Sequence, residues 1–274
     1  MSGAEVIRVS PEWLALREPA DAEARARDLA EALERALPVS GSRVIHDLGC
    51  GTGAMGRWLA PLLTGPQHWI LHDRDEELLA RAVADGPGPA ADGAAVTVAA
   101  MSTDLARLNS DDLAGANLIT ASALLDMLTG EELDRLAVLC AGAGCPILLT
   151  LSVVGRVEMA PADPLDRRVA AAFDAHQRRT TQRGRLLGPD AVEVAAETFR
   201  GLGAEVIVRP SPWRLGPRHS ELTAQWFSGW VDAACEQEAE LVGELEPYAR
   251  RRLEQAHAGK LVVTVGHDDL LVLW

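Results

Sequence analysis

A glycine-rich loop is the segment of this sequence whose residue types and spacing point most clearly to chemistry. Residues 44–53 read Val-Ile-His-Asp-Leu-Gly-Cys-Gly-Thr-Gly, so Gly49, Gly51 and Gly53 are two apart and follow a short apolar stretch. Glycine permits a tight backbone turn and lets a ligand approach the main chain without meeting a Cβ atom. In an open parallel sheet, ligands bind at the carboxyl ends of the strands. The loop therefore predicts a ligand site after the first strand.

Two acids accompany the loop and narrow the class of ligand. Asp47 stands just before it, and Asp73 ends the next apolar stretch, residues 68–73. A carboxylate at the position of Asp73 can accept both hydroxyls of a ribose. Residues 51–56 also fit the dinucleotide pattern G-x-G-x-x-G, but a carboxylate beside the loop repels a pyrophosphate and attracts an ammonium group. The pattern favours a methyl-sulfonium cofactor with an amino-acid tail over NAD.

Short apolar strands that alternate with helices must position this loop. Such alternation is typical of parallel β-α-β units with right-handed crossovers, and it predicts an α/β fold. The last strand is predicted at the edge of the sheet, with a turn near Gly266. The predicted strands are 43–49, 68–73, 94–100, 115–122, 145–155, 204–209 and 260–274, and the helices between them are 54–63, 76–84, 131–142, 161–179 and 190–201.

Helical segments outside the alternation predict additions to this sheet. Residues 21–37 are rich in helix formers, with Asp21 as a plausible N-cap, and residues 219–256 read as helical with an interruption at Pro247. We therefore expect two regions along the chain, the second with two helical insertions. The expected boundaries are 1–40 for an N-terminal helical arm, 41–274 for the main domain, and 156–188 and 216–258 for the insertions.

Composition excludes several classes of protein. The 26 Lys and Arg residues against 40 Asp and Glu give a net charge of −14, which disfavours binding to nucleic acid or to anionic membranes. No apolar run approaches the roughly 20 residues of a membrane helix, and the charged N-terminus shows no signal peptide, so we expect a cytoplasmic protein. The four cysteines form no C-x-x-C pair and have no histidine at ligand spacing, so no metal is expected.

On these motifs the sequence resembles the class I S-adenosylmethionine-dependent methyltransferases, over roughly residues 40–155 by motif and 200–274 by strand pattern. The resemblance implies a Rossmann-like, mostly parallel seven-stranded sheet with a reversed last strand. It implies S-adenosyl-L-methionine as cofactor, with Asp73 on the ribose and Arg74 beside the adenine. The cofactor-binding residues that it implies are Asp47, Gly49, Cys50, Gly51, Thr52, Gly53, Asp73, Arg74, Asp104, Leu105, Ala121 and Ser122.

The acceptor side is less constrained by the sequence. His176 lies on the apolar face of the helix 161–179, one turn after Phe173, and its ordinary pKa suits a general base. Asp126 and Glu158, placed after strands four and five, are alternative catalytic residues. Each of these also has a plain structural explanation, as a satisfied histidine, a helix cap or a surface charge. The aromatic residues proposed to line a substrate pocket, with core packing as the alternative, are Phe173, Trp213, Trp226 and Trp230.

One basic run and one arginine before the N-terminal helix complete the candidates. Residues 178–185 carry four arginines that form either a solvated face or a contact to an acidic substrate group, and Arg17 is placed to reach the cofactor carboxylate. We expect an enzyme that methylates an oxygen or nitrogen of a small molecule, as a monomer or homodimer that binds no nucleic acid or membrane. The alternatives are an RNA or protein methyltransferase, an NAD-dependent oxidoreductase and a cofactor-binding partner without catalysis.

Overall fold

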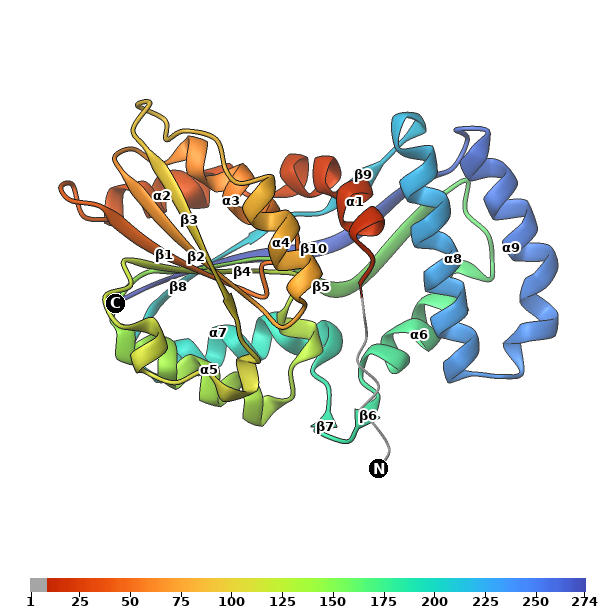
Figure 1. Cartoon of the computed structure of the whole chain (residues 1–274). Coiled ribbons are helices and arrows are strands. Elements are labelled where there is room, and N and C mark those ends of the chain that lie inside the picture. The colour runs from red at the N-terminus through yellow and green to blue at the C-terminus, as the bar shows by residue number, and fades with distance from the viewer. Residues whose placement is uncertain (1–8) are drawn as a thin grey trace.

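A twisted, mostly parallel sheet forms the centre of the computed structural model, which describes residues 9–274 (Figure 1). The strand order is β3-β2-β1-β4-β5-β10-β8, and β10 runs antiparallel to both of its neighbours. This confirms the predicted α/β fold with a reversed last strand, to which β9 adds an unpredicted eighth strand. The strands of this sheet are β1 Arg43–Leu48, β2 Gln67–Asp73, β3 Val96–Ser102, β4 Leu118–Ser122, β5 Ile147–Ala160, β8 Glu205–Pro210, β9 Trp213–Leu215 and β10 Val262–Leu273.

Helices cover both faces of the sheet and bury its apolar side chains. Side chains alternate along a strand, so Leu118 and Leu148 pack with α2 and α3, whereas Ile119 and Leu149 pack with α5 and α7 on the opposite face. Local signals fix the helix ends, as in α5, which begins at a capping box that Thr129 forms with Glu132. The bounds are α1 Pro11–Ala24, α2 Arg27–Ala36, α3 Ala54–Leu59, α4 Glu76–Ala84, α5 Gly130–Ala143 and α7 Ala191–Gly201.

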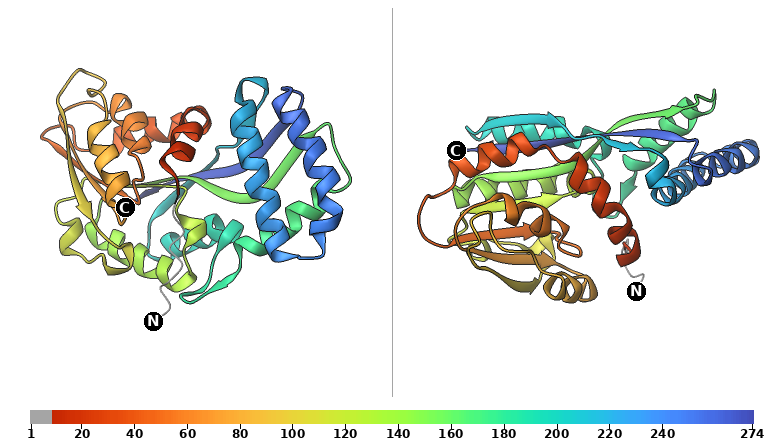
Figure 2. Two further views of the ribbon diagram at one scale, coloured as in Figure 1. Left: turned by 45° about the vertical axis from the view of Figure 1, so that its right-hand side comes forward. Right: turned by 90° about the horizontal axis from the view of Figure 1, so that it is seen from above.

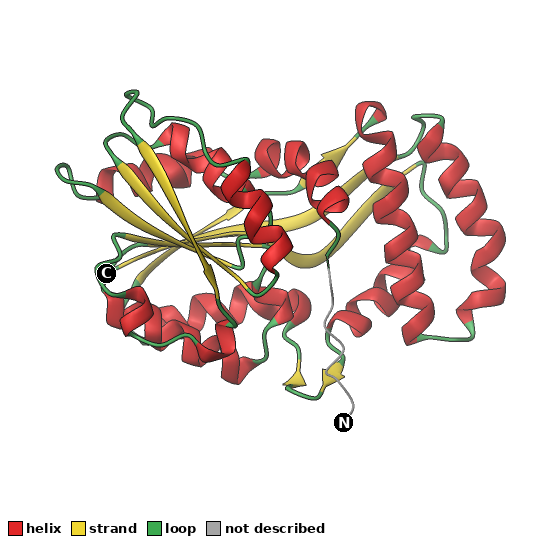
Figure 3. Cartoon of the chain, viewed as in Figure 1, coloured by secondary structure: helices red, strands yellow, loops and turns green. Residues whose placement is uncertain are grey.

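Strands β5 and β10 extend beyond the other strands of the sheet, and their extensions support a separate group of helices (Figures 2 and 3). The group consists of α6 (Asp166–Gln177), α8 (Ser220–Gln237) and α9 (Leu241–His257), and the short hairpin β6 (Thr180–Thr181) and β7 (Gly184–Arg185) follows α6. A second apolar core fills this part. It is built from aromatic residues of β9, α8 and α9 against the strand extensions, namely Trp213, Phe227, Trp230, Tyr248, Met159, Val263 and Val265.

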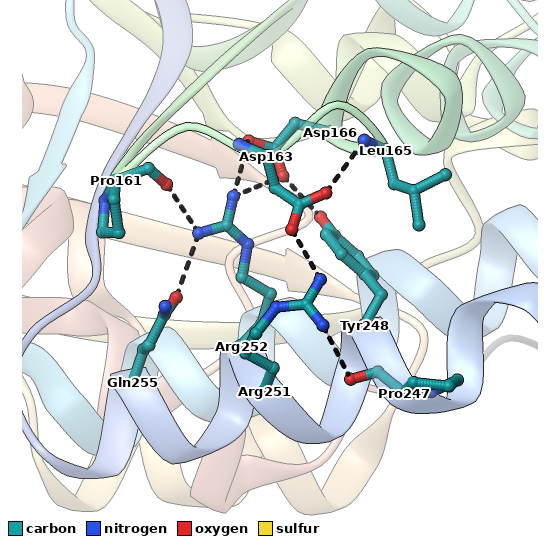
Figure 4. Close-up of polar contacts among 9 residues, drawn as sticks. All are labelled: Pro161, Asp163, Leu165, Asp166, Pro247, Tyr248, Arg251, Arg252 and Gln255. Atoms are coloured by element: carbon teal, nitrogen blue, oxygen red, sulfur yellow. Dashed lines mark hydrogen bonds and ion pairs between the residues drawn. The ribbon is translucent and has the colours of Figure 1, made fainter.

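A buried ion pair ties α9 to the start of α6 (Figure 4). Arg252 is 1% exposed, and one of its terminal nitrogens lies 2.6 Å from each carboxylate oxygen of Asp166. The hydroxyl of Tyr248 donates to the same carboxylate at 2.7 Å, and the other terminal nitrogen of Arg252 donates to the Pro161 carbonyl at 2.6 Å. Because removal of one member leaves a buried charge without its partner, this contact is important for the helical group.

Two predicted helix boundaries differ from the structure for tertiary reasons. Asp21 does not cap a helix: α1 begins at Pro11, capped by Ser10, and Asp21 lies buried inside it, where it accepts a hydrogen bond from the Trp213 indole at 2.9 Å. The predicted interruption at Pro247 is also wrong. This proline lies within α9, and the helical region is interrupted before Leu241, where α9 begins. The buried residues of α9 hold the helix together despite the hydrogen bond that proline removes.

The two long strands account for the other differences. The predicted fifth strand ends at residue 155, but β5 continues to Ala160, so the first helical insertion begins later than expected. The predicted turn near Gly266 is a bulge in a continuous strand, and β10 lies between β5 and β8 and not at the edge. Glycine is required there because a Cβ atom would lie 2.9 Å from Cβ of Arg156. Within residues 9–274, no helix is long and apolar enough to cross a membrane.

Candidate functional site

The glycine loop adopts a backbone conformation that favours glycine at each of its three alternate positions. The φ angles of Gly49, Gly51 and Gly53 are +67°, +55° and +84°. At Gly53 a Cβ atom would also lie 3.2 Å from Cβ of Ala82 on α4, so both conformation and space require glycine. The loop lies at the carboxyl end of β1, which is the end of a parallel sheet where ligands bind.

Asp73 connects the end of β2 to this loop. Its Oδ2 accepts a hydrogen bond from the Gly51 N–H at 2.9 Å, and its Oδ1 accepts one from the Asp75 N–H at 3.0 Å. Each carboxylate oxygen can accept a second hydrogen bond. The carboxylate therefore fixes the loop and still has capacity for the two hydroxyls of a ribose.

Asp47 is buried beneath the loop with one oxygen unsatisfied. It is 1% exposed, and its Oδ1 accepts a hydrogen bond from the Thr120 hydroxyl at 2.7 Å, whereas its Oδ2 has no partner among residues 9–274. Burial raises the pKa of Asp47 to about 7, against the opposing effects of the Thr120 hydrogen bond and the positive charge of Arg25. A cation that contacted Oδ2 would satisfy this atom and favour the ionised carboxylate.

Arg25, which the sequence analysis did not single out, brings a positive charge to the same place. It connects α1 to α2, is 3% exposed, and donates to the hydroxyls of Ser122 at 3.2 Å and Thr150 at 3.4 Å. Its guanidinium lies 5.3 Å from the centre of the Trp58 ring, and its Nη1 has no hydrogen-bond partner in the described part of the chain. Burial lowers the pKa of Arg25, while neighbouring carboxylates, Asp47 among them, oppose this.

A second buried carboxylate holds the Arg25 segment against the sheet. Asp269 on β10 accepts hydrogen bonds from the N–H groups of Ala26 and Leu151, both at 2.8 Å, and from the Ser211 hydroxyl at 2.5 Å. Leu151 has a φ of +57°, a left-handed conformation that costs energy for a leucine and that the Asp269 contact helps to maintain. Two consecutive acids in an otherwise apolar strand were the sequence signal for this contact.

Helix α1 covers the loop from outside. The Leu14 side chain reaches within 3.2 Å of where a Cβ of Gly51 would lie, and Glu18 pairs with Arg57 of α3 through contacts of 2.7 and 2.6 Å. Arg17 is bonded to Asp21 at 2.9 Å and lies 5.1 Å from the centre of the Trp213 ring. The proposed contact of Arg17 with a cofactor carboxylate stays a prediction, and Arg25 is the deeper arginine.

Asp126 and Ala123 mark the loop that follows β4. Ala123 has a φ of +52°, a strained conformation for a residue with a side chain. Asp126 lies in a short 3₁₀ turn and is partly exposed. Burial of the carboxyl group raises the pKa of Asp126 to about 6, and the positive charges of Arg17 and Arg179 act in the opposite direction. A carboxyl group with this pKa suits proton transfer near neutral pH.

The remaining predicted cofactor residues follow the ends of β1 to β4. Ala121 pairs in register with Leu48, and a Cβ at Gly49 would lie 4.0 Å from a terminal carbon of Leu105. Asp104 caps a short 3₁₀ helix through the Ala106 N–H at 3.0 Å. Burial raises the pKa of the Cys50 thiol, which keeps it protonated. The structure thus brings the loop, Leu105 and Ser122 to one end of the sheet, with Thr52 and Arg74 in the adjoining turns.

The predicted acceptor residues do not form one group. His176 Nε2 lies 3.0 Å from a carboxylate oxygen of Glu236 on α8, so this histidine links two helices. Glu158 lies inside β5 on its exposed face, because the strand continues past the predicted end. Trp230 is buried and stacks with Trp226 at 5.4 Å between ring centres, within the second core.

Two other predicted aromatic residues also pack inside the protein. The ring of Phe173 lies 6.4 Å from the ring of Trp230, centre to centre, at the edge of the second core. Trp213 is 3% exposed and packs against His267 with 5.2 Å between ring centres. Within the described part of the chain, no group of three or more His, Cys, Asp or Glu residues could hold a metal ion.

Known structures with a similar fold were found, although no protein-family model and no curated protein matches the sequence. A cyclopropane-fatty-acyl-phospholipid synthase-like protein from Lactobacillus casei superimposes with a TM-score of 0.53 at 16% identity, over 94% of this chain and 92% of that one. A cyclopropane synthase from Mycobacterium tuberculosis superimposes with a TM-score of 0.50 at 13% identity, over 95% and 94% of the two chains. At these identities the likeness establishes the fold alone, a Rossmann-like α/β fold.

Proposed function

We propose that this chain is a class I S-adenosyl-L-methionine-dependent methyltransferase that transfers a methyl group to an oxygen or nitrogen atom of a small molecule. The observation that carries the proposal is the pair of unsatisfied buried atoms below the glycine loop, Asp47 Oδ2 and Arg25 Nη1. Their charges are opposite, and each influences the pKa of the other group. An α-amino acid group, with its ammonium and its carboxylate, is complementary to both.

The geometry of β4 supports this assignment. Thr120 bonds to Asp47 and Ser122 bonds to Arg25, and residues two apart on a strand share a face of the sheet. The two charged groups therefore lie along one face at the end of β4. Asp73, with its remaining acceptor capacity, stands at the ribose end of the same site. A pyrophosphate would meet the Asp47 carboxylate and be repelled, which argues against an NAD-dependent oxidoreductase.

The chemistry of the proposed reaction needs alignment more than acid–base groups. S-adenosyl-L-methionine supplies a methyl group on a positively charged sulfur, and the protein holds the acceptor atom in line with it. Ala121 and Ser122, at the end of β4, are the residues we place beside this methyl group. Asp126 then follows within the same loop, and we assign it the role of general base for an acceptor that arrives protonated.

Several features favour a small molecule over RNA or protein as acceptor. The net charge is −14, and within the basic run Arg178 pairs with Asp190 at 2.6 Å and Arg183 with Glu132 at 2.8 Å, so these arginines are neutralised within the chain. We propose a cytoplasmic enzyme, monomeric or dimeric, with the site between the sheet and the helical group as its active site.

The proposal is tested with methyl-labelled S-adenosyl-L-methionine and a cell extract separated into small-molecule and macromolecular fractions. We expect the label in the small-molecule fraction with the native protein and with Asp232→Ala, which removes an exposed acid on α8. Asp73→Ala is expected to abolish the transfer. Label in the macromolecular fraction contradicts the assignment of a small molecule, and absence of both transfer and cofactor binding contradicts the proposal as a whole.

A further inference from the structure

Within residues 9–274, Arg179 forms no ion pair and is partly buried, a combination that no other arginine of the run 178–185 shows. Among the residues that the structure describes, its guanidinium contacts only the carbonyl of His176 at 3.1 Å and the ring of the same histidine at 3.5 Å. Arg178 and Arg183 each form an ion pair, whereas Arg185, which also forms none within the described residues, is exposed to solvent. The side chain of Arg179 is partly buried, where an unpaired positive charge is unfavourable.

The backbone around Arg179 is fixed against the loop that follows β4. The Leu186 N–H donates to the Arg179 carbonyl at 3.2 Å, and the Leu187 N–H donates to the Leu128 carbonyl at 2.8 Å. Thr129 and Leu186 form an isolated β-bridge between the two segments. Arg179 is therefore anchored beside the loop that carries Asp126, whose carboxyl group experiences the charge of Arg179.

Arg17 approaches the same carboxyl group from α1, but its charge is already used. Its guanidinium makes two hydrogen bonds to Asp21, at 2.9 and 3.3 Å, and lies over the ring of Trp213. Among the residues that the structure describes, Arg179 is thus the cation beside Asp126 that no acid pairs with. Its planar fork of donors is suited to a carboxylate or a phosphate.

We infer that Arg179 binds an anionic group of the methyl acceptor, a carboxylate or phosphate, and so orients the acceptor atom toward Asp126 and the end of β4. The inference rests on the proposed function, since it names the class of substrate for that site. The inference is compatible with a net charge of −14, because a single cation acts locally on a bound anion whatever the average charge of the surface.

The test measures binding of simple probes to the protein saturated with S-adenosyl-L-homocysteine. The probes are inorganic phosphate, benzoate, and benzamide, the neutral isostere of benzoate. Their binding is measured by nuclear magnetic resonance titration. The variants are Arg179→Gln and, as a matched control in the same hairpin, Arg185→Gln, which removes an exposed arginine. Comparison of phosphate with benzoate identifies which anion Arg179 prefers.

We expect an anionic probe to bind the native protein and Arg185→Gln, and to bind Arg179→Gln at least about tenfold more weakly, because a charge-assisted hydrogen bond is lost. Asp126→Asn is expected to strengthen anion binding, since it removes a nearby negative charge. Three results overturn the inference: equal weakening in both arginine variants, benzamide binding as well as benzoate, or no anion binding at all. Saturable binding of S-adenosyl-L-homocysteine is measured in the same samples. If this ligand binds and no anion does, the inference fails while the proposed function stands.

An internal role for Arg179 gives a different pattern. If Arg179 serves only to neutralise Asp126, then Arg179→Gln lowers the stability of the protein, Asp126→Asn restores it in the double variant, and neither changes the binding of phosphate or benzoate. That result also overturns the inference.

Discussion

Replacement of Asp47 by asparagine is expected to change how the stability of the protein depends on pH. The pKa of Asp47 rises from 3.8 to about 7 on folding, mainly because the carboxyl group is buried. The unfolded chain therefore loses this proton near pH 4, whereas the folded chain keeps it until about pH 7. A difference of about 3 in pKa corresponds to about 4 kcal/mol of folding free energy, which is present at low pH and lost as pH rises through this window.

Asp47→Asn removes this loss, since an amide does not ionise. The variant has a separate cost that does not depend on pH, because its buried NH₂ group replaces the unsatisfied Oδ2 and needs a new acceptor. For each pH we take the free energy of unfolding of the variant minus that of the native protein. The constant cost cancels when this difference at pH 8 is compared with the difference at pH 4. We expect that comparison to favour the variant by up to about 4 kcal/mol.

The assay is urea unfolding of the native protein, Asp47→Asn and the exposed control Asp232→Asn, each from pH 4 to pH 8 and without cofactor. Changes in other groups with pH cancel between the native protein and the variant. If the free energies of unfolding of Asp47→Asn and the native protein differ by the same amount from pH 4 to pH 8, the raised pKa of Asp47 is refuted. Such a result would mean that Asp47 is ionised in the folded protein throughout, through contacts with Arg25 stronger than the burial that opposes them.

Three further outcomes follow from the structure. Arg25→Gln is expected to weaken binding of S-adenosyl-L-homocysteine roughly tenfold in calorimetry, because a buried donor to a carboxylate is lost, and unchanged affinity would remove Arg25 from the site. Arg252→Met is expected to lower the free energy of unfolding by about 3–5 kcal/mol, since Asp166 is then left without its partner, and an unchanged urea midpoint would contradict this. Burial lowers the pKa of His46 to about 4 and the pKa of His267 to about 3. The unfolded histidines gain protons near pH 6.5, so the free energy of unfolding is expected to decrease as pH falls from about 6.5 toward these values. His267→Gln should make that fall less steep, and an identical pH profile would contradict it.

The sequence was sufficient for the parts of the fold that depend on local pattern. The alternation of strands and helices predicted the parallel sheet, and the glycine spacing predicted the turn that Gly49, Gly51 and Gly53 make with positive φ angles. Asp73 stands at the end of β2, where a ribose-binding acid was expected. These features are readable because each depends on residues within one strand–turn–helix unit.

The parts that the sequence did not predict depend on contacts between distant segments. Arg25 stands in a run of helix formers, and it is identified by its contacts with Ser122 and Thr150, which lie 97 and 125 residues away. Glu158 was expected after the fifth strand, predicted to end at residue 155, whereas pairing with β10 extends this strand to Ala160. Leu14 lies over Gly51 because α1 begins ten residues earlier than the pattern suggested, at Pro11.

The central claim is that the loop from Asp47 to Gly53 binds S-adenosyl-L-methionine. Calorimetric titration of the purified protein with S-adenosyl-L-homocysteine, and separately with NAD, tests it most directly, with Asp73→Ala and Asp232→Ala titrated alongside. We expect saturable one-to-one binding of S-adenosyl-L-homocysteine to the native protein and to Asp232→Ala, at least about tenfold weaker binding to Asp73→Ala, and no heat from NAD. Binding of NAD in its place, or equal affinity of Asp73→Ala and the native protein, would contradict the account.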